Sequence, residues 1–188
     1  MTITAAGSSW SPADHPDAIA VSEAHQWFST ILLQLHRLRS DSVPGLAGDS
    51  RQLDARVLVI ALIQLTIAAK LMQEAAKAVG GGQVEERMGA AQQQFRDALP
   101  GIEHMRNGLT HFDNWALGKG RGPQQVRRNN GEATADIARD FWYFGFDCEA
   151  GSVSLGPYDF GIDMAERAAR EMYHLICDAG QALDEENP

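Results

Sequence analysis

The sequence lacks the features that mark secreted and membrane proteins. Only two cysteines, Cys148 and Cys177, occur in 188 residues. Neither has a second cysteine or a histidine at metal-ligand spacing, so we expect two reduced, buried thiols. No uncharged apolar run approaches the roughly 18 residues that a membrane-spanning helix requires, and the first residues show no pattern of a secretory signal. These absences predict a soluble chain in the cytoplasm without membrane contact.

Positive charge is also scarce, because 16 lysines and arginines stand against 25 aspartates and glutamates, giving a net charge of −9. Affinity for a phosphate backbone comes chiefly from cations, so this balance excludes an extended nucleic-acid footprint. The cations are unevenly placed, however, and one group follows residue 117: Lys119, Arg121, Arg127 and Arg128. Any nucleic-acid contact is therefore expected to be local and to lie near this group.

The apolar residues that are present follow a helical period over most of the chain. A hydrophobic share of 44% and a charged share of 22% suit one globular domain. Spacings of three and four predict helices at residues 17–40, 100–117 and 161–183. The apolar run at 50–79 could also suit a strand, but its length and the helix-forming residues that continue it predict a helix, and a Gln- and Ala-rich run predicts another at 84–98. Residues 1–16 show no such period and are expected to form a flexible arm before a single domain at 17–184.

Two segments between the last helices follow other patterns. Residues 118–135 have the glycine-rich, polar composition of a mobile loop. The run after it alternates with a period of two, which predicts a β-hairpin within 136–156 whose Trp142, Phe144 and Phe146 face the core. The predicted fold is therefore mainly α: an up-and-down bundle of four to five helices with a β-hairpin inserted before the last helix.

The predicted helix at 100–117 has an unusual number of polar residues. On a helical wheel its apolar arc contains Ile102, Met105, Leu109, Phe112 and Ala116. A polar stripe of His104, Asn107 and His111 points away from that arc. Arg106 and Asp113 lie at the boundary, where they could form an ion pair. Three polar side chains that can contact a phosphate, next to the cations after residue 117, indicate a site.

The run Arg106-Asn107-Gly108-Leu109-Thr110-His111 resembles the motif of the HEPN superfamily, in which arginine is followed by Asn, Asp or His and, after three more residues, by histidine. The chain is similar to a HEPN domain in its fold as well, because that superfamily has a bundle of four or more helices with the motif near the start of a late helix. The continuation His111-Phe112-Asp113-Asn114-Trp115, followed by Gly118 and Gly120, resembles a bacterial group within the superfamily.

This resemblance implies a metal-independent endoribonuclease that needs no cofactor and acts in a toxin-antitoxin or defence system. His111 would be the general acid or base, Arg106 would stabilise charge on the phosphate, and Asn107 would orient His111 or the phosphate. A wider set would bind RNA: His104, Lys119, Arg121, Arg127 and Arg128. An antitoxin protein would be a further partner.

A homodimer is also expected. Members of the superfamily often pair so that two motifs face each other, and the wheel separates Arg106 from His111 by about 140°. One isolated helix therefore does not present both side chains side by side. A second copy across a two-fold axis, meeting the first through the helix that carries Arg106 and His111, would build a composite cleft.

Two other classes of function stay open. Glu171 and His174 form one Glu-x-x-His pair, which ligates iron or manganese in some helical bundles, although such centres use two pairs and two further glutamates. Alternatively, the 100–117 helix and the basic segment after it form a non-catalytic module that binds a protein or a nucleotide.

Overall fold

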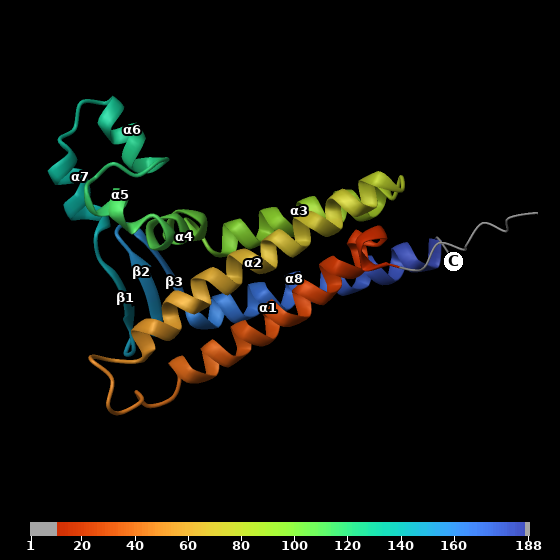
Figure 1. Ribbon diagram of the computed structural model, residues 1–188, viewed down its shortest axis with the longest axis horizontal. Coiled ribbons are helices and arrows are strands. Elements are labelled where there is room, and N and C mark those ends of the chain that lie inside the picture. Colours follow the sequence, from red (N-terminus) through yellow and green to blue (C-terminus); the bar gives the residue numbers. More distant parts are fainter. Residues whose placement is uncertain (1–10, 187–188) are drawn as a thin grey trace, which may run out of the picture.

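The computed structural model describes residues 11–186, which are mainly α-helical (Figure 1). Four long helices form a bundle: α1 (Pro16–Leu38), α2 (Arg51–Ala78), α3 (Gly82–Ala98) and α8 (Ile162–Glu186). They run alternately up and down, and α2 packs against each of the other three. The predicted fold class, a mainly α bundle with a β element before its last helix, is confirmed.

The period of the apolar residues identified the buried faces of α1 and α8. In α8 the predicted face is buried at every position: Ile162, Ala165, Ala169, Met172, Ile176, Ala179 and Leu183. In α1 the side chains from Ala24 to Leu38 on the predicted face are buried and Val21 is half-buried. Burial of one apolar face of an amphipathic helix is the main source of helix stability in a protein of this kind.

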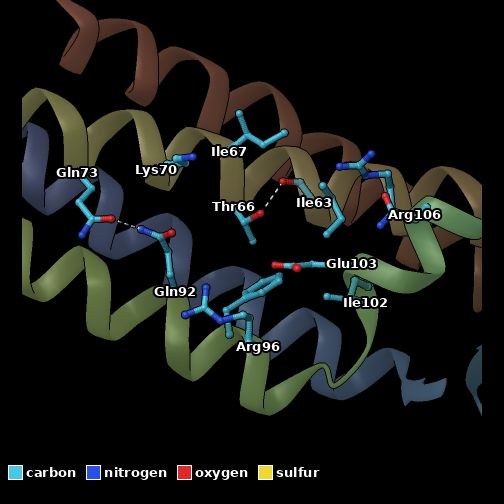
Figure 2. A pocket seen from close by; sticks show the side chains of 12 residues that line it. Ile63, Thr66, Ile67, Lys70, Gln73, Gln92, Arg96, Ile102, Glu103 and Arg106 are labelled. Carbon is cyan, nitrogen blue, oxygen red and sulfur yellow. Dashed lines mark hydrogen bonds between the residues drawn. The ribbon is translucent and has the colours of Figure 1, made fainter. Parts of the chain in front are cut away.

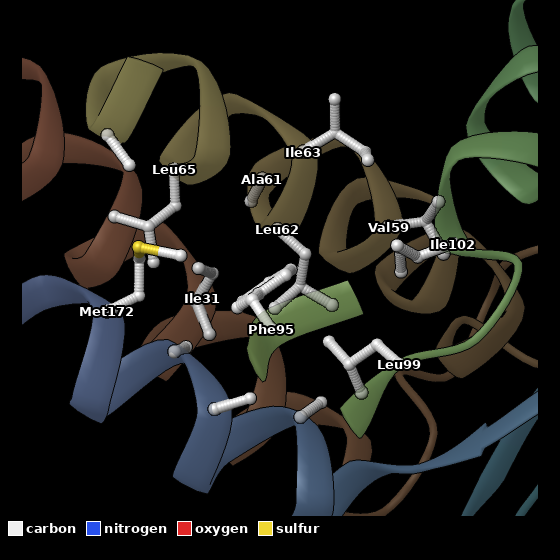
Figure 3. Close-up of a cluster of buried hydrophobic side chains, with 14 of the residues drawn as sticks. Ile31, Val59, Ala61, Leu62, Ile63, Leu65, Phe95, Leu99, Ile102 and Met172 are labelled. Atoms are coloured by element: carbon white, nitrogen blue, oxygen red, sulfur yellow. The ribbon is translucent and has the colours of Figure 1, made fainter. Parts of the chain in front are cut away.

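Helix α2 is apolar on most of its circumference because it lies in the middle of the bundle. Leu62 and Leu65 are fully buried and pack with Ile31 of α1, Phe95 of α3 and Met172 of α8 (Figure 3). Within the described residues, α2 is also the one helix long and apolar enough to cross a membrane. More than half of its most apolar window is buried inside the bundle, which is typical of the core helix of a soluble protein.

The elements between α3 and α8 gather at one end of the bundle (Figure 1). They are α4 (Ile102–Thr110), α5 (Phe112–Ala116), α6 (Pro123–Asn129), α7 (Thr134–Phe141), β1 (Phe144–Asp147), β2 (Ser152–Leu155) and β3 (Tyr158–Gly161). The predicted mobile loop at 118–135 is wrong, because it contains α6 and the start of α7. Its polar residues bond to one another and to nearby carbonyl groups, which composition alone does not indicate.

The β element is an antiparallel sheet of three strands in the order β1-β2-β3, where a two-stranded hairpin was predicted. Residues 136–141 belong to α7, and the third strand follows Gly156, whose φ of +56° suits a tight reversal after Leu155. Phe146 is buried and Phe144 half-buried, as predicted. Trp142 is 67% exposed because the chain enters the sheet only at Phe144.

Two further predictions concern the ends and the thiols. Most of the predicted arm, residues 1–10, lies outside the described residues, and Pro12–Asp14 form a short 3-10 helix directly before α1. Both cysteines are free thiols, but Cys148 is exposed and Cys177 half-buried. The prediction of a buried Cys148 is wrong because this residue follows β1 in the turn to β2.

Candidate functional site

The helix predicted at 100–117 breaks at His111. Helix α4 ends at Thr110, His111 has φ −123° and ψ 41°, and α5 begins at Phe112. The His111 amide still donates to the Asn107 carbonyl at 2.9 Å, while the His111 carbonyl accepts from the Trp115 amide at 3.1 Å. The chain therefore continues as a helix on a new axis after residue 111.

Because of this break, the predicted apolar arc is wrong for the residues after His111. Ile102 and Met105 are buried, but Phe112 is 70% exposed. Trp115, and not Phe112, is the buried aromatic residue of α5. Its ring packs edge-to-face on the Phe141 ring, with the two ring centroids 5.6 Å apart. Gly108 leaves space for this arrangement, because a β-carbon there would collide with Leu155 and press on Trp115. Ala116, also predicted in the arc, is exposed.

A cavity of about 490 Å³ lies where α4, α5 and the segment after α5 meet. Its polar lining includes Asn107, His111, Lys119 and Arg121, and we call it the His111 cavity. His111, Lys119 and Arg121 are exposed, and none of the four side chains hydrogen-bonds to, or ion-pairs with, another residue in the described part of the chain. The cavity thus presents a histidine ring and two cations without partners among the described residues to solvent.

Arg106 lines a different cavity, of about 450 Å³, between α2, α3 and α4 (Figure 2). Lys70, Arg96 and Glu103 share this cavity, and Figure 2 shows Arg106 at the end opposite Gln73 and Gln92. Asn107 lines both cavities. The structure therefore places Arg106 and His111 on two sides of Asn107, as their separation on the wheel implies.

The predicted ion pair between Arg106 and Asp113 does not form among the described residues. The Asp113 carboxylate instead accepts a hydrogen bond from the side-chain amide (Nδ2) of Asn114 at 3.1 Å. The break at His111 turns α5 away from the axis of α4, so a seven-residue spacing no longer places the two side chains on one face. The Arg106 guanidinium is left without a hydrogen-bond partner in the range 11–186.

His104 lines neither the His111 cavity nor the cavity that contains Arg106. Its ring packs on the Tyr158 ring, with centroids 5.1 Å apart, and lies close to Gly122. Burial of this region raises the pKa of the Tyr158 hydroxyl. The predicted stripe therefore divides: Asn107 and His111 face one cavity, and His104 contacts β3.

Two of the predicted RNA-binding arginines are engaged within the protein. The Arg127 guanidinium pairs with Glu132 and, at 2.7 Å, with Asp140, and it lies over the Phe141 ring. Its hydrogen bond to Glu132 raises the pKa of Arg127 and lowers that of Glu132. Nη1 of Arg128 donates to the carbonyls of Gly118 at 2.7 Å and Gly120 at 3.0 Å.

These contacts have a positioning role. Arg128 holds the segment that carries Lys119 and Arg121 in place through its hydrogen bonds to Gly118 and Gly120. Gln124, which is fully buried, accepts from the Gly120 amide at 2.7 Å and donates to the Trp115 carbonyl at 3.1 Å. Sequence reasoning missed Gln124, because its two partners are backbone groups of Gly120 and Trp115, which no side-chain pattern marks.

The alternative of a metal-binding bundle has no supporting geometry in the described part of the chain, where no group of three or more His, Cys, Asp or Glu side chains could hold a metal ion. Glu171 and His174 are both exposed on α8.

Comparisons of the chain with protein-family models, with curated proteins and with solved structures found no match. The resemblance to the HEPN superfamily therefore rests on the motif and on the helical bundle.

Proposed function

We propose that the protein is a metal-independent endoribonuclease of the HEPN type that acts at the His111 cavity. The observation that carries this proposal is the lining of that cavity, where the side chains of Asn107, His111, Lys119 and Arg121 meet and have no partners within residues 11–186. Unpaired cations beside a histidine are suited to a phosphodiester, because the cations attract the anionic group and histidine exchanges protons near neutral pH. The motif supports the same roles.

The proposed reaction uses the ribose 2′-hydroxyl as nucleophile. His111 accepts the proton of that hydroxyl, the 2′-oxygen attacks phosphorus, and the bond from phosphorus to the 5′-oxygen breaks. The leaving oxygen takes up a proton, so the products are a 2′,3′-cyclic phosphate and a 5′-hydroxyl. Lys119 and Arg121 hold the phosphate, and Asn107 orients it or His111.

Arg106 completes the proposed site through a homodimer. Because Arg106 and His111 of one chain line different cavities, a second copy that meets α4 across a two-fold axis would bring the Arg106 of one copy toward the His111 of the other. We further propose that the protein works in the cytoplasm in a toxin-antitoxin or defence system, with an antitoxin protein as partner.

A second candidate function follows from the same separation. If the chain acts without such a dimer, one phosphate does not meet both Arg106 and His111, and the cavities bind a nucleotide or a partner without cleaving it. This alternative keeps Lys119 and Arg121 as ligand-binding residues and assigns no catalytic role.

The two functions are distinguished by incubating purified protein with end-labelled RNA in EDTA. We expect the wild type to cut the RNA and leave 2′,3′-cyclic phosphate ends, and His111→Ala to lose about 100-fold or more of that activity, the usual contribution of a general acid or base. His36→Ala is the matched control, because His36 is exposed on α1 far from α4 in the sequence. Binding without cleavage by the wild type would favour the second function.

The dimer is tested by light scattering on the same samples. Mixing inactive His111→Ala with inactive Arg106→Ala should restore part of the activity, because mixed dimers contain one intact composite site. No recovery together with a monomeric mass at high concentration would contradict the dimeric enzyme.

A further inference from the structure

An apolar groove of about 310 Å³ lies beside the His111 cavity and has no part in the proposed reaction. Its aromatic lining comes from α5, the end of α7 and the start of β1: Phe112, Trp115, Phe141, Trp142 and Phe144. Phe112 and Trp142 are 70% and 67% exposed. Two large rings that leave most of their surface in water mark a binding surface more often than a packing surface.

The groove and the His111 cavity adjoin each other at Trp115. Trp115 lines both, and Phe112 directly follows His111 in the chain. Gly108 lines the groove while its neighbour Asn107 lines the cavity. An anionic group in the His111 cavity and a flat ring in the groove would therefore lie against residues that are adjacent in the chain.

The charge around the two spaces favours such a ligand. In a chain of net charge −9, no carboxylate lines the groove or the His111 cavity within the described residues. The one charged side chain of the groove is Arg56, whose guanidinium carbon lies 4.9 Å from the centre of the Phe144 ring. Aromatic rings beside cations are the combination that binds single-stranded nucleic acid, because bases stack on the rings while cations attract phosphates.

We propose that this groove binds an unpaired base of single-stranded RNA, stacked on Trp142 and Phe112, while the neighbouring phosphate enters the His111 cavity. The assignment rests on the proposed function, since it takes RNA as the ligand of that cavity. The groove selects single-stranded over double-stranded RNA, because the bases of a duplex are already stacked and paired. It accepts any base, because stacking is tolerant of sequence.

The test measures binding of two fluorescent probes to the full chain. One is a short 2′-O-methyl RNA, which lacks the attacking hydroxyl, and the other is the same strand with abasic sites through its middle. Trp142→Ala should weaken binding of the base-bearing strand by about 5- to 150-fold. It should leave binding of the abasic strand unchanged, and Trp142→Phe should restore most of the affinity. Leu33→Ala, which removes an exposed side chain on α1, is the control.

The outcomes separate this inference from the proposed function. If the wild type binds neither strand, both fail. If Lys119→Ala weakens both strands while Trp142→Ala weakens neither or both equally, the groove inference fails and the RNA site survives. If Trp142→Ala lowers the molecular mass in light scattering without changing the affinity for the base-bearing strand, the groove is a protein interface and the inference is overturned.

Discussion

At the scale of single residues, the arginines after α5 divide into two groups with different roles. Arg121 is exposed and lines the His111 cavity without a partner among the described residues. Arg128 donates to two carbonyls, and Arg127 is held by two carboxylates. A cation that already satisfies buried or half-buried acceptors stabilises the fold, whereas an unpaired one is available to a ligand.

Replacing these arginines should therefore give opposite results. Arg128→Ala should lower the free energy of unfolding by about 1–3 kcal/mol, because it leaves the Gly118 and Gly120 carbonyls without their donor. Arg121→Ala should leave stability within about 0.5 kcal/mol of the wild type and weaken RNA binding. Urea unfolding and a binding titration on both variants measure this. Equal losses of stability would contradict the division of roles.

At the scale of elements, two glycines with positive φ, Gly118 and Gly131, form the turns that separate the short helices α5, α6 and α7. Gly118 has φ +67° at the end of α5, and a β-carbon there would collide with the Thr134 carbonyl at the start of α7. Gly131 has a similar φ of +84° before α7, but nothing lies within 4 Å of the β-carbon position. Gly118 is therefore needed both because its φ is positive and because a side chain would have no room, whereas Gly131 is needed only because its φ is positive.

Gly131→Ala should accordingly cost about 1–2 kcal/mol, the usual penalty of the left-handed conformation for a residue with a β-carbon. Gly118→Ala should cost about 3 kcal/mol or more, because α5 and α7 must also move apart. Thermal unfolding of both variants gives the comparison. Similar losses would show that the contact with Thr134 is not tight in solution.

The start of α2 predicts a dependence on pH. Hydrogen bonds from the Arg51 guanidinium and backbone amide lower the pKa of Asp49 from 3.8 to about 2. Since the pKa is lower in the folded state, the contribution of the Asp49 carboxylate to stability is fully present above about pH 4 and is lost as the pH falls through about 2.

The difference in urea midpoint between wild type and Asp49→Asn should thus be present at pH 7, shrink below about pH 4 and vanish only below about pH 2. Asp41→Asn, in the same loop, is the control. A difference that stays constant with pH would mean that Asp49 acts through something other than its charge.

At the scale of the whole molecule, α2 supplies the centre of the bundle and its apolar character is explained by burial. Leu65 has no exposed surface, whereas Leu53 on the same helix is 55% exposed. The four long helices carry this core, and the elements from α4 to β3 stand at one end. The His111 cavity and the aromatic groove lie among these elements, whereas the Arg106 cavity lies between α2, α3 and α4.

Leu65→Ala should lower the free energy of unfolding by about 2–5 kcal/mol because it leaves a cavity in the core. Leu53→Ala should change it by less than about 0.5 kcal/mol. Both proteins should purify without detergent, and urea unfolding gives the values. A requirement for detergent, or equal effects of the two substitutions, would contradict the role of α2 as a core helix.

The sequence by itself determined the long helices, their buried faces and the place of the β element. These follow from local periodicity: the apolar residues of α1 and α8 recur every three or four positions, and that spacing defines a face before any partner helix is present. The same reasoning identified the residues that line the His111 cavity, because Asn107, His111, Lys119 and Arg121 stood out as polar or basic groups near one another in the chain.

Only the tertiary structure decided which of those groups are free. The break at His111, the burial of Trp115 and the exposure of Phe112 depend on space left by Gly108 and on packing against Phe141. The partners of Arg127 and Arg128 lie five to thirteen residues away in a segment without periodicity. Such pairings form only when the chain folds back on itself, so no pattern in the sequence could separate the engaged cations from the available ones.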